Sequence, residues 1–327
     1  MSIPASRPTA QNVLLADIGG TNARFALLAN GAVGAITHLA VSNYPSFGEA
    51  LSAYLGGRTE AGTVGAACIA VAGTVQNGRC VMTNSPWVID AGEVRAAHGF
   101  ATVRLVNDFE AVAWSLHRLP SDRLLRIGGG QPVAGAPLVA LGPGTGLGVA
   151  VSVPHAGGYL VLPGEGGHAT LPGCSSREDA VIAHLRQRFG HVSAERVLSG
   201  SGLENLYEAL AALDHATPAR RRAAEITAAG IEGTCRTSRE AIDMFCAMLG
   251  TVAGNLALTL GASGGIFIAG GILQHMPKYF AGSSFRARFE EKGRFDVYLR
   301  AIPTYLILGE DTAFVGLQGL AEVEGLG

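Results

Sequence analysis

The apolar positions of the chain form two kinds of pattern, short and mainly apolar runs and longer stretches with helical spacing. Mainly apolar runs bounded by turn residues predict strands over 13–18, 23–29, 64–71 and 102–106. Apolar residues spaced three or four apart predict helices over about 108–118, 176–189, 204–213, 237–260 and 311–323. Because the predicted strands and helices alternate along the chain, the pattern indicates an α/β protein.

Two glycine-rich turns each join a pair of apolar runs, which predicts a β-hairpin in each half of the chain. GGTN at 19–22 joins the first pair, and GPGTG at 142–146 joins the runs of LVALGPGTGLGVAV. Bare glycine backbone lets several N–H groups approach one anion, so such a turn can bind phosphate. A tight hairpin turn without a ligand is the alternative.

Neither turn has the phosphate-loop pattern GxxxxGK[ST] or the dinucleotide pattern GxGxxG. The chain has only two lysines, Lys278 and Lys292, and both lie outside glycine-rich turns. If phosphate binds at these turns, backbone amides and a bound cation must therefore neutralise most of its charge.

Residues 244–277 contain no Asp, Glu, Lys or Arg, a length that could span a bilayer. The segment nevertheless contains several polar residues and the sequence GASGG at 261–265, so it predicts a buried helix, a turn and a buried strand. GASGG matches the nucleophile pattern GxSxG, but the helix precedes the strand, and Ser263 is therefore predicted to be a turn residue. Further along, VYLRAIPTYLIL at 297–308 predicts another strand before the last helix, which could pack against the first domain.

The composition narrows the class of protein. A chain of 327 residues predicts two domains, and 46 glycines with 15% charged residues indicate a turn-rich α/β protein. A net charge of -2 argues against nucleic-acid binding, and the basic cluster Arg220–Arg222 is interpreted as a solvated helix face.

The cysteines and the start of the sequence bear on location. Five cysteines without a CxxC pair indicate reduced thiols in the cytoplasm. The opening MSIPASRPTAQN is polar and interrupted by proline, so no export signal is predicted.

Three acidic or amide side chains follow predicted strands. Asp17 ends a strand before a glycine-rich turn, where an ionised carboxylate needs a partner: a Mg²⁺ carrying nucleotide phosphates, or turn N–H groups. Asn107 and Asp108 lie between a strand and a helix, so either could cap that helix. A carboxylate at this end of a strand is also where an α/β enzyme would place a general base.

A second group of candidates lies in PGEGGHATL at 163–171. Glu165 and His168 are three residues apart, but Gly166 and Gly167 make a helix improbable, and in a loop the pair could hydrogen-bond neighbouring sugar hydroxyls. A zinc site would need more ligands, and Cys174 is the only nearby thiol. Read alone, Glu195 in SAERVLSGSGL is an ordinary surface carboxylate.

Taken together, these segments resemble the bacterial glucokinase family, ATP-dependent hexose kinases with the actin, Hsp70 and hexokinase-like fold. The resemblance runs from about residue 12 to 322 and rests on six motifs in order: LLADIGGTNARFAL, VNDFEAVA, LGPGTGLGVAV, PGEGGHATL, FGHVSAERVLSGSGLENLY and IFIAGGI. It implies two actin-like, ribonuclease H-like α/β domains with a cleft between them. The small domain would comprise 10–118 and 309–327 with the first phosphate loop, and the large domain 119–308 with the second phosphate loop and the adenosine segment.

The resemblance also assigns site residues and cofactors. ATP with Mg²⁺ is implied, and Asp17 would contact the metal indirectly. The sugar would be held by Asn107, Asp108, Glu165, His168 and Glu195, with Asp108 taking the proton from the attacking hydroxyl. The nucleotide would be held by Ala16, Asp17, Ile18, Gly19, Gly20 and Thr21, by Gly142, Gly144, Thr145 and Gly146, and by Gly270 and Gly271.

Two departures from the family pattern qualify the resemblance. Ser201 replaces the usual proline of SGPGL after Glu195. The cysteine cluster of the related repressor and zinc-containing sugar kinases is absent, so His168 is expected to bind sugar and no zinc is expected.

The expected reaction is phosphorylation of glucose at its 6-hydroxyl, with a sugar and a nucleotide as the only partners, no nucleic acid and no membrane. The family often forms dimers, which extends the expectation to a homodimer. The alternatives are a kinase for another hexose, a sugar-sensing protein without activity, and a partner-driven ATPase of the same fold.

Overall fold

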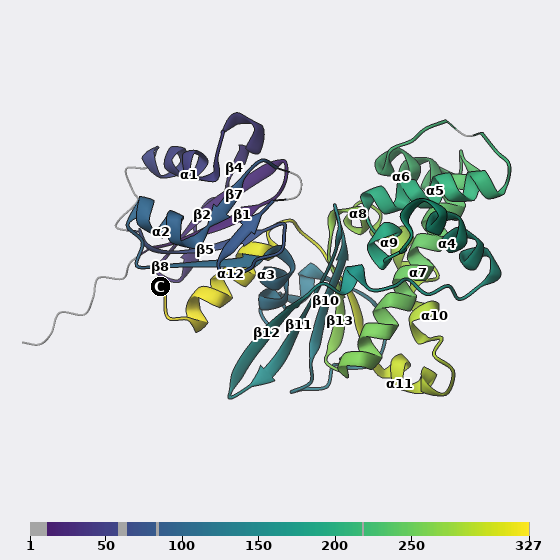
Figure 1. The fold of residues 1–327 in the computed structure, drawn as a ribbon. Coiled ribbons are helices and arrows are strands. Elements are labelled where there is room, and N and C mark those ends of the chain that lie inside the picture. The colour runs from purple at the N-terminus through teal and green to yellow at the C-terminus, as the bar shows by residue number, and fades with distance from the viewer. Residues whose placement is uncertain (1–11, 58–63, 83–84, 218, 327) are drawn as a thin grey trace, which may run out of the picture. The chain divides into compact units, whose positions relative to one another are not determined.

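The computed structural model describes residues 12–57, 64–82, 85–217 and 219–326, which divide into two compact units (Figure 1). Unit 1 consists of Met1–Leu119 with Asp311–Gly327, and unit 2 consists of Pro120–Glu310. Each unit contains a six-stranded sheet with helices packed on it, so the α/β class is confirmed.

The sheet of unit 1 combines an antiparallel hairpin with two parallel strands. Its strand order is β3-β2-β1-β5-β8, with β4 also paired to β2. The two long strands of the hairpin are followed by strands that run parallel to β1. The members are β1 Asn12–Ile18, β2 Asn22–Ala29, β3 Ala32–Val33, β4 Thr37–Ala40, β5 Val64–Val71 and β8 Thr102–Asn107.

Apolar side chains cover both faces of this sheet, which explains why successive residues of β1 and β5 are mainly apolar. One face packs against a cluster that includes Phe25, Phe47 and Trp87. The other face packs against a cluster that includes Phe314 and Leu317. The remaining elements of the unit are α1 Phe47–Gly56, β6 Arg79–Val81, β7 Val88–Asp90, α2 Ala91–His98, α3 Asp108–Ser115 and α12 Thr312–Val323.

The sheet of unit 2 repeats the same plan. Its strand order is β12-β11-β10-β13-β14-β9, in which β10 and β11 form an antiparallel hairpin and β13 and β14 run parallel to β10. The strands are β9 Leu124–Gly128, β10 Leu138–Pro143, β11 Leu147–His155, β12 Gly158–Gly164, β13 Gly265–Ile268 and β14 Thr304–Ile307. Each unit therefore contains an antiparallel hairpin that is followed by two parallel strands.

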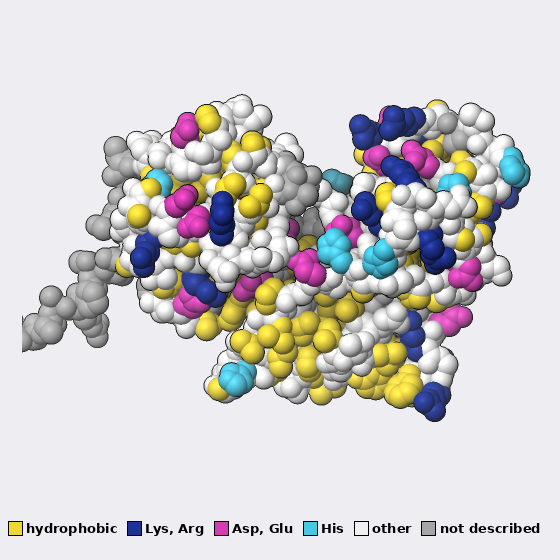
Figure 2. All heavy atoms as spheres, viewed as in Figure 1, with side chains coloured by type: hydrophobic (Ala, Val, Ile, Leu, Met, Phe, Trp, Pro, Cys, Tyr) yellow, Lys and Arg dark blue, Asp and Glu magenta, His cyan; other side chains and the backbone are white. Residues whose placement is uncertain are grey.

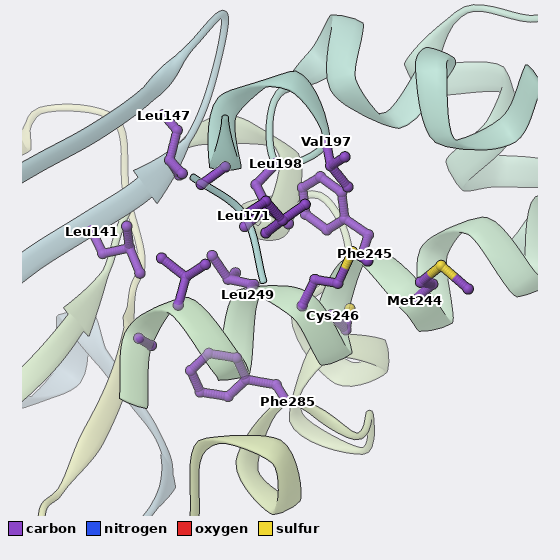
Figure 3. Close-up of a cluster of buried hydrophobic side chains, with 14 of the residues drawn as sticks. Leu141, Leu147, Leu171, Val197, Leu198, Met244, Phe245, Cys246, Leu249 and Phe285 are labelled. Carbon is purple, nitrogen blue, oxygen red and sulfur yellow. The ribbon is translucent and has the colours of Figure 1, made fainter. Parts of the chain in front are cut away.

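The core of unit 2 lies between its sheet and the long helix α7, Arg236–Leu260 (Figure 3). Leu141 and Leu147 from the hairpin lie in the same buried cluster as Phe245 and Leu249 from α7. The other helices of the unit are α4 Ser176–Phe189, α5 Gly200–Leu213, α6 Ala223–Glu232, α8 Gly271–Gln274, α9 Pro277–Ala281, α10 Phe285–Glu290 and α11 Asp296–Ala301.

The apolar face of this sheet extends to its edge strand, β12. Leu160 and Leu162 pair with Val153 and Val151 on the same face, but they are 48% and 49% exposed. Figure 2 shows hydrophobic side chains gathered over this part of the sheet. The edge strand β12 therefore carries apolar side chains on the same face as the core residues of β11, but these side chains are about half exposed to solvent.

The segment without charged residues folds as the sequence predicts. Helix α7 is long and apolar enough to cross a membrane by length and composition, but 78% of its most apolar window is buried inside the protein. Gly261 ends the helix with a φ of 59°, which favours glycine, and Ser263 lies in the turn before β13. The packing is that of a core helix, a turn and a buried strand.

Two predictions about local structure are wrong. The run 297–308 is not one strand, because residues Asp296–Ala301 form α11 and only Thr304–Ile307 forms a strand. An Asp296–Arg300 ion pair of 2.7 Å supports the helix, and Pro303 separates it from the strand. The cluster Arg220–Arg222 does not lie on a helix face, since it precedes α6 and Arg222 is the N-cap residue.

The packing of α12 on α3 gives a direct test of unit 1. A Cβ on Gly316 would overlap the carbonyl oxygen of Ala111 in α3. We expect Gly316→Ala to lower the free energy of unfolding by about 2 kcal/mol or more, because backbone cannot move aside as a side chain can. Urea unfolding followed by circular dichroism measures this change.

Gly319→Ala is the matched control on the same helix. Its Cβ would lie 2.9 Å from Nε of Arg118, the end of a flexible side chain. The better helix propensity of alanine, worth roughly 1 kcal/mol, should offset that contact. Equal losses in the two variants would contradict a specific backbone contact at Gly316.

Candidate functional site

The first glycine-rich turn places Asp17 opposite Arg24 on the neighbouring strand. The two residues pair across the β1–β2 hairpin, and Nη1 of Arg24 lies 3.4 Å from Oδ2 of Asp17. Within the turn, Gly19 N–H donates to the carbonyl of Asn22 at 2.9 Å. The ion pair with Arg24 is therefore a partner that neither sequence interpretation of Asp17 included.

Asn107 fixes the junction between β8 and α3. Its Oδ1 accepts hydrogen bonds from the backbone N–H of Phe109 and Glu110 at 2.9 and 3.4 Å. Its Nδ2 donates to the carbonyl of Gly73 at 3.1 Å. Asn107, and not Asp108, is thus the helix cap that the sequence predicted for one of the two residues.

Asp108 is the first residue of α3, and its carboxyl group has an unusual pKa. Oδ1 accepts a hydrogen bond from Phe109 N–H at 2.9 Å, which favours the ionised form. Burial and the negative charge of Asp17 outweigh this bond and raise the pKa to about 7. A carboxyl group that titrates near neutrality is suited to taking up a proton as a general base.

Asp311, at the start of α12, is a residue that the sequence interpretation missed. Burial is the main cause that raises the pKa of Asp17, and the charge of Asp311 raises it further against the effect of Arg24. The starts of α3 and α12 therefore each bring a carboxyl group within electrostatic range of Asp17 on β1. An acidic residue before a helix is a weak signal, because it is also the usual sign of a cap.

The second glycine-rich turn is the tight connection of the β10–β11 hairpin. Pro143 pairs with Leu147, and Gly144 N–H donates to the carbonyl of Gly146 at 2.8 Å. The backbone N–H of Leu147 donates to Oε2 of Glu195 at 2.9 Å. A residue that looked like an ordinary surface carboxylate thus contacts the turn directly.

His168 lies beside this turn at the end of a short 3-10 helix, Gly166–His168, and Glu165 is the residue directly before that helix. Both side chains are more than half exposed, and Nε2 of His168 lies 3.8 Å from Oε2 of Glu165. A Cβ on Gly167 would overlap the carbonyl oxygen of Leu147, so glycine lets this segment lie directly on β11. Its side chains remain open to a ligand.

Backbone hydrogen bonds join this segment to the one that carries Glu195. Leu171 N–H donates to the carbonyl of Val192 at 3.0 Å, and Ala194 N–H donates to the carbonyl of Ala169 at 2.9 Å. Unit 2 therefore brings Glu165, His168 and Glu195 together around the second glycine-rich turn.

The predicted adenosine segment also contacts this turn. Ala269 N–H donates to the carbonyl of Leu141 at 2.9 Å. Gly270 has a φ of 97°, and a Cβ there would overlap the carbonyl oxygen of Pro143. Gly271 then begins α8. Residues 269–271 therefore lie beside 142–146, where the parallel strands β10 and β13 both end.

Among the residues that the structure describes, no group of three or more His, Cys, Asp or Glu side chains is arranged to hold a metal ion. Cys174 is exposed, and its sulfur lies 3.7 Å from the hydroxyl of Thr251.

The electrostatic link between Asp17 and Asp108 predicts the effect of removing one charge. Asp17→Asn should lower the pKa of Asp108 from about 7, because the repulsion that helps to raise it is gone. Titration of the Asp108 carboxyl carbon by NMR measures the pKa directly. An unchanged or higher value would contradict the link.

A stability measurement supplies the control. Between the unfolded pKa of about 3.9 and the folded value near 7, the folded state holds a proton that the unfolded state has lost, so stability falls as pH rises. Asp108→Asn removes the ionisable group, so its free energy of unfolding should decrease less over this pH range than that of the wild type. The contribution should be on the order of 2 kcal/mol, since the side chain is partly exposed.

Comparison with known proteins gives consistent matches along the chain. The model of the glucokinase family matches residues 14–323. The glucokinase of Paramagnetospirillum magneticum is 49% identical over 313 residues, covering 95% of this chain and 97% of the relative. A crystal structure of glucokinase from an Antarctic psychrotroph superposes with a TM-score of 0.86 at 33% identity, covering 96% of this chain and 100% of the other.

A more distant structure shows the same fold. The ROK family glucokinase from Streptomyces griseus, in complex with glucose and AMPPNP, has a TM-score of 0.64 at 19% identity and covers 95% of this chain and 98% of its own.

Proposed function

This chain belongs to the glucokinase family, and we propose that it transfers the γ-phosphate of ATP to the 6-hydroxyl of glucose, with Asp108 as the general base. It has the two-domain actin-like α/β fold of glucokinases and related sugar kinases, as the resemblance implied. The observation that carries the proposal for Asp108 is its position directly after β8, at the start of α3, with a pKa of about 7.

In the proposed reaction, the oxygen of the 6-hydroxyl forms a bond to the γ-phosphorus while the bond to the β-phosphate oxygen breaks. The hydroxyl proton passes to the Asp108 carboxylate, and glucose 6-phosphate and ADP are the products. A positioned base of this kind contributes typically ~10²- to 10⁴-fold. The hydrogen bond from Phe109 N–H fixes the direction of the carboxylate for this step.

The two glycine-rich turns are proposed to hold the nucleotide phosphates. Bare backbone at both turns leaves N–H groups available to phosphate oxygens. Gly270 and Gly271, beside the second turn, are proposed to lie along the adenosine. Use of ATP is supported by the family and by the AMPPNP in the Streptomyces griseus structure.

We propose that Mg²⁺ carried by ATP binds near the carboxyl groups of unit 1. Asp17 forms an ion pair with Arg24, and the negative charges of Asp108 and Asp311 act on the Asp17 and Asp108 carboxyl groups in the same unit. Carboxylate oxygens and substrate phosphates are the ligands that Mg²⁺ uses in kinases, often through water. When bound with ATP, the ion would neutralise phosphate charge, and we propose that Asp17 contacts it indirectly.

The sugar is proposed to contact five residues, which are Asn107, Asp108, Glu165, His168 and Glu195. The exposure of Glu165 and His168 supports this role, because both side chains are accessible to a ligand from solvent. All five cysteines are free thiols, which supports a reducing compartment such as the cytoplasm.

The homodimer implied by the family stays a prediction, which light scattering would check.

ADP release from ATP–Mg²⁺ with and without a panel of hexoses tests the reaction. We expect strong stimulation by glucose and phosphorylation at the 6-position. Stronger stimulation by an epimer would indicate a kinase for another hexose. Turnover that no hexose changes would support an ATPase, and binding of sugar without turnover would support a sensor.

The role of Asp108 predicts a specific pH dependence. The ratio kcat/KM for glucose should fall as pH drops below about 7, because the base is then protonated in the free enzyme. Asp108→Asn should lower kcat by ~10²-fold or more while leaving glucose binding measurable. Stopped assays across the pH range, with calorimetric glucose binding, measure both effects.

Glu110→Gln is the matched control on the same helix. Burial raises the pKa of Glu110 as well, but the proposed reaction does not use this residue. The variant should keep the wild-type pH profile. Normal kcat in Asp108→Asn would remove Asp108 from the role of base.

Substitution of His168 tests whether this residue binds sugar or zinc. His168→Ala should weaken glucose binding by about tenfold, the loss of one or two hydrogen bonds to the ligand. His155→Ala, an exposed histidine at the other end of β11, should have no effect. Metal analysis of the purified wild type should find no zinc, and stoichiometric zinc that is lost in His168→Ala would overturn the assignment.

A further inference from the structure

The Glu195 carboxylate lies against the second glycine-rich turn at two adjacent residues. Its Oε2 accepts the hydrogen bond from Leu147 N–H at 2.9 Å. A Cβ on Gly146 would overlap the same oxygen, so the carboxylate occupies the space that any other residue at 146 would need.

The segment after Glu195 is joined to the turn at a second point. Gly200 N–H donates to the carbonyl of Gly144 at 2.9 Å. Ser199 bridges the two contacts, because its hydroxyl donates to the carbonyl of Glu195 at 2.8 Å and accepts from Gly202 N–H at 2.9 Å. Glu195 and the start of α5 therefore hold the turn as one hydrogen-bonded unit.

Gly144 shows that the requirement at Gly146 is specific. In the part of the chain that the structure describes, and apart from its own chain neighbours, no atom lies within 4 Å of the position that a Cβ on Gly144 would take. Neither glycine has a left-handed φ, so neither needs to be glycine for its backbone conformation. What an added Cβ would meet therefore differs between the two positions, because the carboxylate lies beside Gly146 alone.

We propose that Glu195 is a positioning residue for the second glycine-rich turn, and that Gly146 is glycine in order to admit its carboxylate. Oε2 is engaged by Leu147, which leaves Oε1 for a sugar hydroxyl. One carboxylate then contacts both the sugar and the turn proposed to hold phosphate, so the position of the turn depends on the sugar. The effect on the sugar rests on the proposed function, whereas the contact with Leu147 does not.

Glucose binding without nucleotide distinguishes the two glycines. Gly146→Ala should weaken glucose binding by about tenfold or more, because the displaced carboxylate can no longer reach the sugar from its fixed position. Gly144→Ala should weaken glucose binding less than Gly146→Ala does, since its methyl group enters open space. Calorimetry measures both affinities, and thermal unfolding checks that both variants fold. Equal effects of the two substitutions would overturn the proposal.

A double-mutant cycle tests whether the effect acts through Glu195. In a Glu195→Ala background, Gly146→Ala should cause no further loss of glucose affinity, because the carboxylate that it displaces is gone. Losses that multiply as independent effects would contradict the proposed contact.

Amide hydrogen exchange at Leu147 tests the contact without sugar or nucleotide. Exchange should be slow in the wild type and in Glu195→Gln, which keeps an oxygen acceptor, and at least about tenfold faster in Glu195→Ala. If this pattern holds but glucose does not bind, the positioning role stands and the proposed function fails. If glucose is phosphorylated but the Leu147 amide exchanges equally in all three proteins, the positioning role fails.

Discussion

Burial of the sheets is the constraint on which the rest of the structure depends. In unit 1 apolar side chains cover both faces of the sheet, and β10 of unit 2 is buried at every position. A charged group inside such a sheet would lose its hydration without compensation. The polar groups of the candidate site lie at or next to the carboxyl ends of strands, with Asp17 near the end of β1 and Asn107 and Asp108 at the junction of β8 and α3. The pKa of Asp108 follows from the same constraint, since its position is still partly desolvated and close to another carboxylate.

Glycine has a second use in this protein besides flexible turns. At Gly167, Gly270 and Gly316, backbone from another segment occupies the space of the missing side chain. At Gly146 the occupant is a carboxylate. These contacts bring segments that are distant in sequence to within direct backbone contact, which is how 166–168 and 269–271 come to lie at the ends of β10 and β11. The high glycine content is thus partly a packing property.

Local patterns were sufficient to predict much of the fold. Apolar spacing predicts the strands of both hairpins, the buried helix α7 and the final helix. In each of these elements the pattern is complete within a short stretch of sequence, so no distant contact is needed to recognise it. The segment 297–308 was mistaken because its apolar residues suit a helix and a strand equally, and Pro303 divides them. The short helices α1, α2 and α6 lie outside the predicted elements and are stabilised by caps and tertiary packing.

The site was predictable where its residues follow a motif and unpredictable where it depends on contacts across the fold. Asp108 follows a strand and precedes a helix, so its position could be inferred from sequence. The proximity of Asp311 to Asp17 and of Glu195 to Leu147 could not, because each pair joins segments far apart in the chain. Nothing in the local sequence of either partner specifies the other.

The discontinuity of unit 1 affects the order in which the protein can fold during synthesis. The cluster beneath α3 combines Val13 and Leu15 with Phe314 and Leu317, which the ribosome adds only after all of unit 2. Until then one face of the first sheet and the inner side of α3 lack their apolar cover. Unit 2 is continuous and can complete its core first. The helix that carries the proposed base therefore acquires its full support last, and a nascent chain that has not yet reached α12 has no complete first unit.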